Sequence, residues 1–280
     1  MTLSCDSLAS LFDRYDAFLI DQFGVLLGGT GPYPGAQDAL ADLAKRGKPV
    51  VILSNSGKRS AMNITRLVQH GFDRDHFETV LTSGEVAHSH LFQSLGRDVP
   101  KHAKAFVIIK DGDPSPFEDL PLSRTTDPNA ADILLIVNRD PSRQIADYRP
   151  ILQRLAARNV PGICTNPDLK MLTPDGLMDS AGFLAQIYTD LGGDVRVFGK
   201  PHRQIYEHAS GVLGRVDPKA TLCIGDSLRH DIAGGAAAGF KTALVRTGID
   251  ADLTDLQLER AIDASGLVPD HVIRSFSLDH

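Results

Sequence analysis

One pattern of apolar and polar positions recurs along the chain. A short apolar run ends abruptly at a polar residue, and glycine-containing or helical sequence follows; this happens before Asp21, before Ser54 and before Asp226. Such runs, separated by amphipathic segments, are typical of parallel strands that are buried on both faces. The pattern therefore predicts an α/β fold with a doubly wound parallel sheet. The helices expected between the strands cover residues 35–46, 60–70, 83–95, 202–213 and 229–238.

The three polar residues are expected to meet in space. In doubly wound sheets the ligand crevice lies beyond the carboxyl ends of the strands. Asp21, Ser54 and Asp226 each stand at such an end. We therefore expect one site built from residues that are distant in sequence.

A second set of elements indicates an inserted domain. We expect a core of residues 1–98 and 194–280, and an inserted α/β domain, residues 99–193, that forms a cap over the crevice. The last ten residues are expected to hold a short strand and a tail. The elements expected in the cap are strands near 105–109, 132–137 and 161–164 and helices near 143–157 and 181–191.

Composition and charge narrow the class of protein. With 280 residues the chain is long enough for two medium domains, and 29 Lys plus Arg against 35 Asp plus Glu give a net charge of −6. We expect no nucleic-acid or membrane partner, because no basic patch and no apolar run of ~20 residues is present. Early charged residues argue against a signal peptide, so a cytoplasmic location is expected. The three cysteines, Cys5, Cys164 and Cys223, are expected to be reduced and buried.

Candidate chemistry begins at Asp21. Taken alone, this residue could equally be a structural cap or a catalytic carboxylate. Further residues change that balance: Ser54 ends the second strand, Lys200 precedes a helix, and Asp226 is followed by Asp231. Each motif is short, and four in a fixed order are far more specific than one.

In this order the motifs resemble those of the haloacid dehalogenase (HAD) superfamily over nearly the whole chain. The Ser54-Asn55 pair, the position of the insert, the Tyr-Pro-Gly-Ala sequence at 33–36 and the Thr-Asn-Pro-Asp sequence at 165–168 look like class IIA of that superfamily. The resemblance implies a capped hydrolase similar to sugar phosphatases and nitrophenylphosphatases. Its substrate would be a small phosphomonoester. The oligomeric state is left open, and a homodimer is one of the alternatives.

The resemblance also implies a metal site. Mg²⁺ would be held by a carboxylate oxygen of Asp21, the backbone carbonyl of Phe23 and the side chain of Asp226, while Asp231 would orient it. Physical chemistry supports this set, because a carboxylate that attacks a phosphoryl dianion needs a cation between the two. Lys200 would neutralise charge on the phosphate.

Polar residues other than Asp21, the expected nucleophile, would bind the substrate. By resemblance, Ser54 and the amides that follow it, at Asn55 and Ser56, would donate to phosphate oxygens. Asn166 and Asp168 follow an apolar run in the insert. An ordinary Asx turn before Pro167 and direct contact with the substrate are equally good interpretations of these two residues.

The sequence departs from the superfamily pattern at Phe23. HAD phosphatases normally have a second aspartate there, which protonates the leaving oxygen, and Phe23 has no proton to give. General acid-base assistance is typically worth ~10²–10⁴ in rate. Unless another group substitutes for the missing acid, we expect slow turnover, an activated substrate or a different leaving group. Two alternatives stay open: a carbon-halide hydrolase similar to 2-haloacid dehalogenases, and a non-catalytic protein that binds phosphate esters.

Overall fold

The computed structural model describes residues 5–110, 115–173, 176–214 and 216–279. Its backbone separates into two compact units. The first unit comprises Met1–Ser54, Ala61–Leu81 and Lys200–His280, and the second comprises Asn55–Ser60 and Thr82–Gly199. The domain boundaries expected from the sequence, after residues 98 and 193, stay a prediction.

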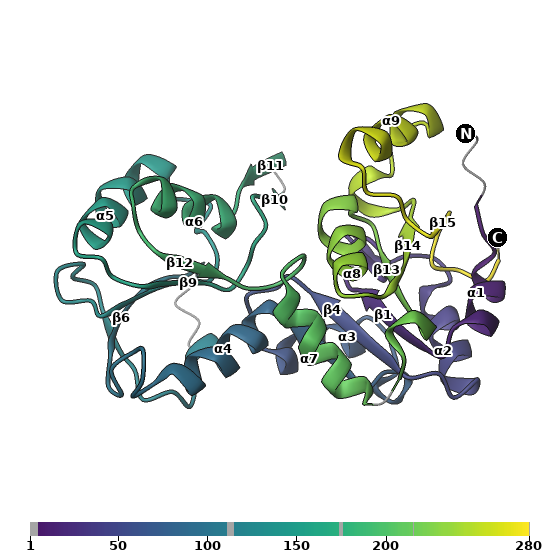
Figure 1. Cartoon of the computed structure of the whole chain (residues 1–280), viewed down its shortest axis with the longest axis horizontal. Helices are drawn as coiled ribbons and strands as arrows, with labels where there is room; N and C mark the ends of the chain where they lie inside the picture. The colour runs from purple at the N-terminus through teal and green to yellow at the C-terminus, as the bar shows by residue number, and fades with distance from the viewer. Residues whose placement is uncertain (1–4, 111–114, 174–175, 215, 280) are drawn as a thin grey trace. The chain divides into compact units, whose positions relative to one another are not determined.

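A six-stranded sheet forms the centre of the first unit, in the order β15-β14-β13-β1-β4-β5 (Figure 1). Each strand pair from β15 to β4 is parallel. The strands are β1 (Ala17–Asp21), β4 (Val50–Ser54), β5 (Thr79–Thr82), β13 (Thr221–Gly225), β14 (Lys241–Val245) and β15 (His271–Ile273).

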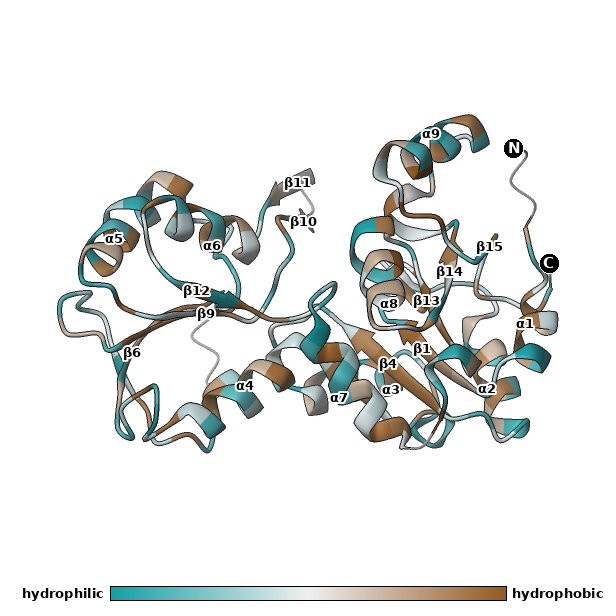
Figure 2. Ribbon diagram, viewed as in Figure 1, coloured by the Kyte–Doolittle hydropathy of each residue, from teal (hydrophilic) through white to brown (hydrophobic). Residues whose placement is uncertain are grey.

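Both faces of this sheet are covered. Every residue of β1, β4 and β13 is buried, and Figure 2 shows the hydrophobic colour along β1 and β4. Phe18 and Ile20 pack with residues of α1, α2 and α3, whereas Leu244 packs with η5 and α9. The helices of this unit are α1 (Leu8–Arg14), α2 (Ala36–Lys45), α3 (Ser60–Gln69), α7 (Arg203–Leu213), α8 (Ala233–Ala237) and α9 (Asp255–Ser265). Ser60, the first residue of α3, is assigned to the second unit.

Shorter elements lie between the helices and strands of the first unit. They are the hairpin of β2 (Leu27–Gly28) and β3 (Gly31–Pro32), the π-helical turn η5 (Leu228–Ile232), and the 3₁₀ turns η1 (Arg74–His76), η4 (Pro218–Ala220) and η6 (Gly248–Asp250).

The second unit has its own parallel sheet of five strands, in the order β12-β9-β8-β6-β7. Side chains of α5 and α6 cover one face of it, with Leu134 and Cys164 of the sheet packed against Tyr148 and Leu184. Its strands are β6 (Lys104–Ile108), β7 (Ser123–Thr125), β8 (Ile133–Ile136), β9 (Gly162–Cys164) and β12 (Val195–Val197). Its other elements are α4 (Ser83–Ser94), η3 (Ser115–Phe117), α5 (Ile145–Ala157), α6 (Ala181–Asp190) and the hairpin of β10 (Lys170–Thr173) and β11 (Gly176–Asp179).

The expected α/β class with parallel sheets is confirmed, and two details differ. The single helix expected over residues 229–238 is instead η5 followed by α8, because the amide of Ala233 bonds to the carbonyl of Leu228, five residues back. Cys164 and Cys223 are buried thiols as expected, but Cys5 is exposed. Unlike the other two, Cys5 does not lie in an apolar strand. No helix within the described ranges is long and apolar enough to cross a bilayer.

Candidate active site

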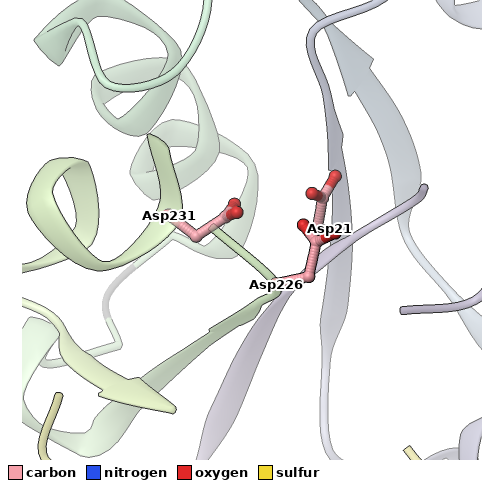
Figure 3. A group of neighbouring side chains, drawn as sticks. All are labelled: Asp21, Asp226 and Asp231. Atoms are coloured by element: carbon pink, nitrogen blue, oxygen red, sulfur yellow. The ribbon is translucent and has the colours of Figure 1, made fainter. Parts of the chain in front are cut away.

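Three aspartates meet at the carboxyl edge of the first sheet. Asp21 is the last residue of β1, and Asp226 follows the last residue of the neighbouring parallel strand β13. Asp231 comes from η5, and its carboxylate points toward the other two (Figure 3). One oxygen from each of the three carboxylates lies within 4.8 Å of the others. All three side chains are buried, with residue exposures of 9%, 3% and 1%.

Lys200 lies inside this cluster. Its Nζ is 2.6 Å from Oδ1 of Asp21 and 2.8 Å from Oδ1 of Asp231, and the side chain is 2% exposed. Burial alone would lower the pKa of Lys200, but the two carboxylates outweigh it and raise that pKa. If every group is ionised, the three aspartates and this ammonium leave two uncompensated negative charges.

The cluster therefore resists full ionisation without a further cation. Burial, and then the charge of Asp231, raise the pKa of Asp226 to about 7. Burial and the charge of Asp231 also raise the pKa of Asp21 well above its ordinary value, although Lys200 acts in the opposite direction. Both effects disfavour the charged carboxylate. A divalent cation among these oxygens would remove the repulsion.

Backbone amides fix the orientation of each carboxylate. The amide of Gln22 donates to Oδ1 of Asp21 at 2.7 Å, and the amide of Ser227 donates to Oδ2 of Asp231 at 3.2 Å. The amide of Ile249 donates to Oδ2 of Asp226 at 2.8 Å. Each acid is thus held by a peptide group that a side-chain substitution does not remove.

Two glycines allow the backbone to come close to Asp226. An added Cβ on Gly24 would lie 2.0 Å from Oδ2 of Asp226, and one on Gly248 would lie 1.9 Å from the same atom. Both residues also have positive φ, 87° and 71°, which favours glycine. The hydroxyl of Thr247 donates to the carbonyl of Gly24, and the amide of Gly248 donates to the hydroxyl of Tyr33 at 3.2 Å.

Sequence reasoning missed this loop of residues 247–249. It follows β14, whose carboxyl end lies at the same edge of the sheet as the ends of β1 and β13. The one signal was Gly248 within Thr-Gly-Ile, and a single glycine is too common to identify a site.

The donor set suits a hard divalent cation. Carboxylate oxygens are the ligands that Mg²⁺ prefers, and the charge of such an ion equals the negative charge left over in the cluster. Gly24 and Gly248 approach the carboxylate of Asp226 so closely that a side chain at either position would overlap it. The residues present therefore fit Mg²⁺, and the ligand role of the Phe23 carbonyl stays a prediction.

The remaining predicted residues fall into two groups. Ser54 is fully buried at the end of β4, beside Asp21, whose strand partner is Leu53. Asn55, Ser56, Asn166 and Asp168 belong to the second unit.

Within the second unit, three of those residues are linked by hydrogen bonds. Asn55 Nδ2 donates to Oδ1 of Asp168 at 2.8 Å, and the amide of Asp168 donates to Oδ1 of Asn166 at 2.9 Å. The second of these bonds is that of an Asx turn. Contact of these residues with a substrate stays a prediction.

Comparisons with known proteins agree with the motifs. A family model described as haloacid dehalogenase-like hydrolase matches residues 18–122, and a second, HAD-hydrolase-like model matches residues 197–277. The chain is similar to 5'-nucleotidase YutF of Bacillus subtilis, with 32% identity over 84% of this chain and 88% of the relative. It is also similar to sugar-phosphatase AraL of the same species, with 30% identity over 82% of each chain.

A solved structure supports the same assignment. A haloacid dehalogenase-like hydrolase from Brucella suis superposes with a TM-score of 0.82 at 28% identity, covering 96% of this chain and 98% of that one. The resemblance expected from the four ordered motifs is thereby confirmed. The chain belongs to the haloacid dehalogenase-like hydrolases.

Proposed function

We propose that this protein is a Mg²⁺-dependent phosphatase that hydrolyses a small phosphomonoester through an aspartyl-phosphate at Asp21. The observation that carries the proposal is the buried cluster of Asp21, Asp226 and Asp231 with Lys200 inside it. The named activities of the similar proteins, on nucleotides and sugar phosphates, agree with this substrate class.

The residues suggest how the reaction would proceed. Lys200 and the amide of Gln22 both contact Oδ1 of Asp21, so Oδ2 has no hydrogen-bond donor among the described residues. A carboxylate oxygen of Asp21 would form a bond to phosphorus while the bond from phosphorus to the leaving oxygen breaks. Lys200 and Ser54 would hold phosphate oxygens, and water would later hydrolyse the aspartyl-phosphate.

The metal would be held by Asp21 and Asp226, with Asp231 beside them. When bound, it would neutralise charge between the carboxylates and the phosphate dianion.

The acidic cluster also weighs against halide hydrolysis. Displacement of halide by a carboxylate needs no cation, yet two further buried acids accompany Asp21 here at a cost in repulsion. A protein that binds phosphate esters without catalysis would keep the same acidic cluster. Only a measurement of turnover distinguishes such a protein from an enzyme.

The proposal is tested by a phosphatase screen of the purified protein with Mg²⁺ or with chelator. Wild type should release phosphate only with Mg²⁺, and Asp21→Asn should abolish release. Asp16→Asn is the matched control, because Asp16 lies just before β1 and is exposed. Phosphate release that survives Asp21→Asn would refute the mechanism. Tight binding without turnover of any ester would support passive binding, and halide release with chelator would support the dehalogenase.

A further inference from the structure

Phe23 is an exposed aromatic side chain next to the buried carboxylates. It is 43% exposed, whereas Gln22 and Val25 on either side of the Phe23-Gly24 segment are fully buried. Gly24 lies directly against the carboxylate of Asp226. Because Phe23 is two residues after Asp21, their Cα atoms are at most about 7 Å apart. The ring thus forms part of the surface immediately outside the cluster.

Arg66, from α3, covers this ring. Its guanidinium carbon lies 5.6 Å from the ring centre. Among the residues that the structure describes, the guanidinium of Arg66 makes no hydrogen bond and no ion pair. A cation stacked on an aromatic ring keeps the N–H groups at its edge available for an anion.

Another stacked arginine in the same unit shows the contrast. Arg74 lies over Phe77 at 5.0 Å, but its guanidinium also donates to the carbonyls of Phe77 and Glu78. These residues lie just before β5, and the amide of Glu78 bonds to Val50 at the start of β4. They therefore belong to the amino edge of the sheet, opposite the carboxylates. The donors of Arg74 are used within the protein, whereas those of Arg66 are not.

We propose that Arg66 determines specificity by binding a second anionic group, a carboxylate or a phosphate, on the organic part of the substrate. This inference rests on the proposed phosphatase function. The carboxylates are buried, so an ester whose phosphorus is at Asp21 must extend its organic part toward the exposed side. Phe23 and Arg66 lie on that side of the cluster.

The chemistry of the guanidinium supports an anion as its ligand. Arginine stays charged at all ordinary pH values, and its fork of donors matches the two oxygens of a carboxylate or the oxygens of a phosphate. The expected ligand is a phosphomonoester that also carries a second anionic group. Phosphorylated hydroxy acids and small bisphosphates fit this description.

The test compares pairs of esters that differ in the second group. The first pair is 3-phosphoglycerate and glycerol 3-phosphate, and the second is fructose 1,6-bisphosphate and fructose 6-phosphate. For the preferred anionic ester, Arg66→Gln should raise KM roughly tenfold or more, since a charged hydrogen bond is lost. KM for the ester that lacks the second anionic group, and kcat for both esters, should stay unchanged. Arg66→Lys should restore part of the lost affinity, and Arg74→Gln should leave KM and kcat for both esters unchanged.

The pairs also distinguish the two kinds of anion. If Arg66→Gln raises KM only within the first pair, the group that Arg66 binds is a carboxylate. If it raises KM only within the second pair, that group is a phosphate. Equal KM changes for the esters with and without the second anionic group, or no change in either, would overturn the inference.

Failure of the proposed function can be separated from failure of this inference. Calorimetric titration of each ester, with Mg²⁺ present, into Asp21→Asn and into the double variant with Arg66→Gln measures affinity without turnover. Absence of turnover in wild type together with an Arg66-dependent difference in affinity would refute only the phosphatase mechanism. Equal affinities in the two proteins would refute the role of Arg66.

Discussion

Removing the cation should make the stability of this protein depend on pH in a specific direction. Folded Asp226 has a pKa raised from 3.8 to about 7, mainly by burial and then by the charge of Asp231. Unfolded, the side chain loses its proton near the ordinary value. Between these pH values the folded state binds more protons, so the metal-free protein should lose stability as pH rises.

The size of this effect follows from the pKa of Asp226. One pH unit corresponds to about 1.4 kcal/mol, so ionising Asp226 in the folded, metal-free protein costs about 4 kcal/mol above pH 7. Ionisation of Asp21, whose pKa is also raised, acts in the same direction. Mg²⁺ at a hundred times its Kd would add about 2.7 kcal/mol to the free energy of unfolding.

The assay is urea unfolding of wild type and Asp226→Asn, with chelator and with Mg²⁺, from about pH 5 to about pH 8. Burial lowers the pKa values of His90 and His202, which acts in the opposite direction, but this contribution cancels in the difference between the two proteins. With chelator, Asp226→Asn should become the more stable protein as pH rises. With Mg²⁺, only wild type should gain stability.

Two results would refute this reasoning. One is a stability difference between the metal-free proteins that does not change with pH. The other is an equal gain from Mg²⁺ in both proteins, because the cation would then bind without Asp226.

Two further predictions concern the backbone near Asp226 and the leaving group. In thermal unfolding, Gly248→Ala should abolish the stabilisation by Mg²⁺, because the added Cβ would overlap Asp226. Gly266→Ala is the control, since Gly266 also has a positive φ, 66°, but has no atom within 4 Å of an added Cβ. It should lower the free energy of unfolding by only about 1–2 kcal/mol and keep the stabilisation by Mg²⁺. A Gly248→Ala protein with the full response to Mg²⁺ would contradict the close approach. In steady-state assays, aryl phosphates should have kcat values ~10²-fold or more above those of sugar phosphates, since Phe23 cannot protonate the leaving oxygen. Equal kcat values would mean that another acid acts.

Much of the fold was predictable because its strands are buried on both faces. Such strands appear as continuous apolar runs, and the runs before Asp21, Ser54 and Asp226 correspond to β1, β4 and β13. The split of the helix after Asp226 was not predictable, because a π-helical turn and an α-helix expose similar residues.

The site was predictable only where side chains carry it. Asp21, Asp226, Asp231 and Lys200 are distinct residue types in a fixed order, and the structure brings them together. The loop that holds Asp226 acts through the amide of Ile249, which any residue type other than proline supplies. The stacking of Arg66 on Phe23 depends on how α3 packs, and the sequence of the helix does not reveal this.

The order of strands in the first sheet determines when this sheet and its acidic cluster can form during translation. β1 has β4 on one side and β13 on the other, so its two neighbours are synthesised far apart in time. Until β13 has been translated, one edge of β1 has no partner and two of the three acids do not yet exist. The five strands of the parallel sheet in the second unit are complete by then. A nascent chain can therefore finish its second unit first, and it becomes able to bind a cation only near the end of translation.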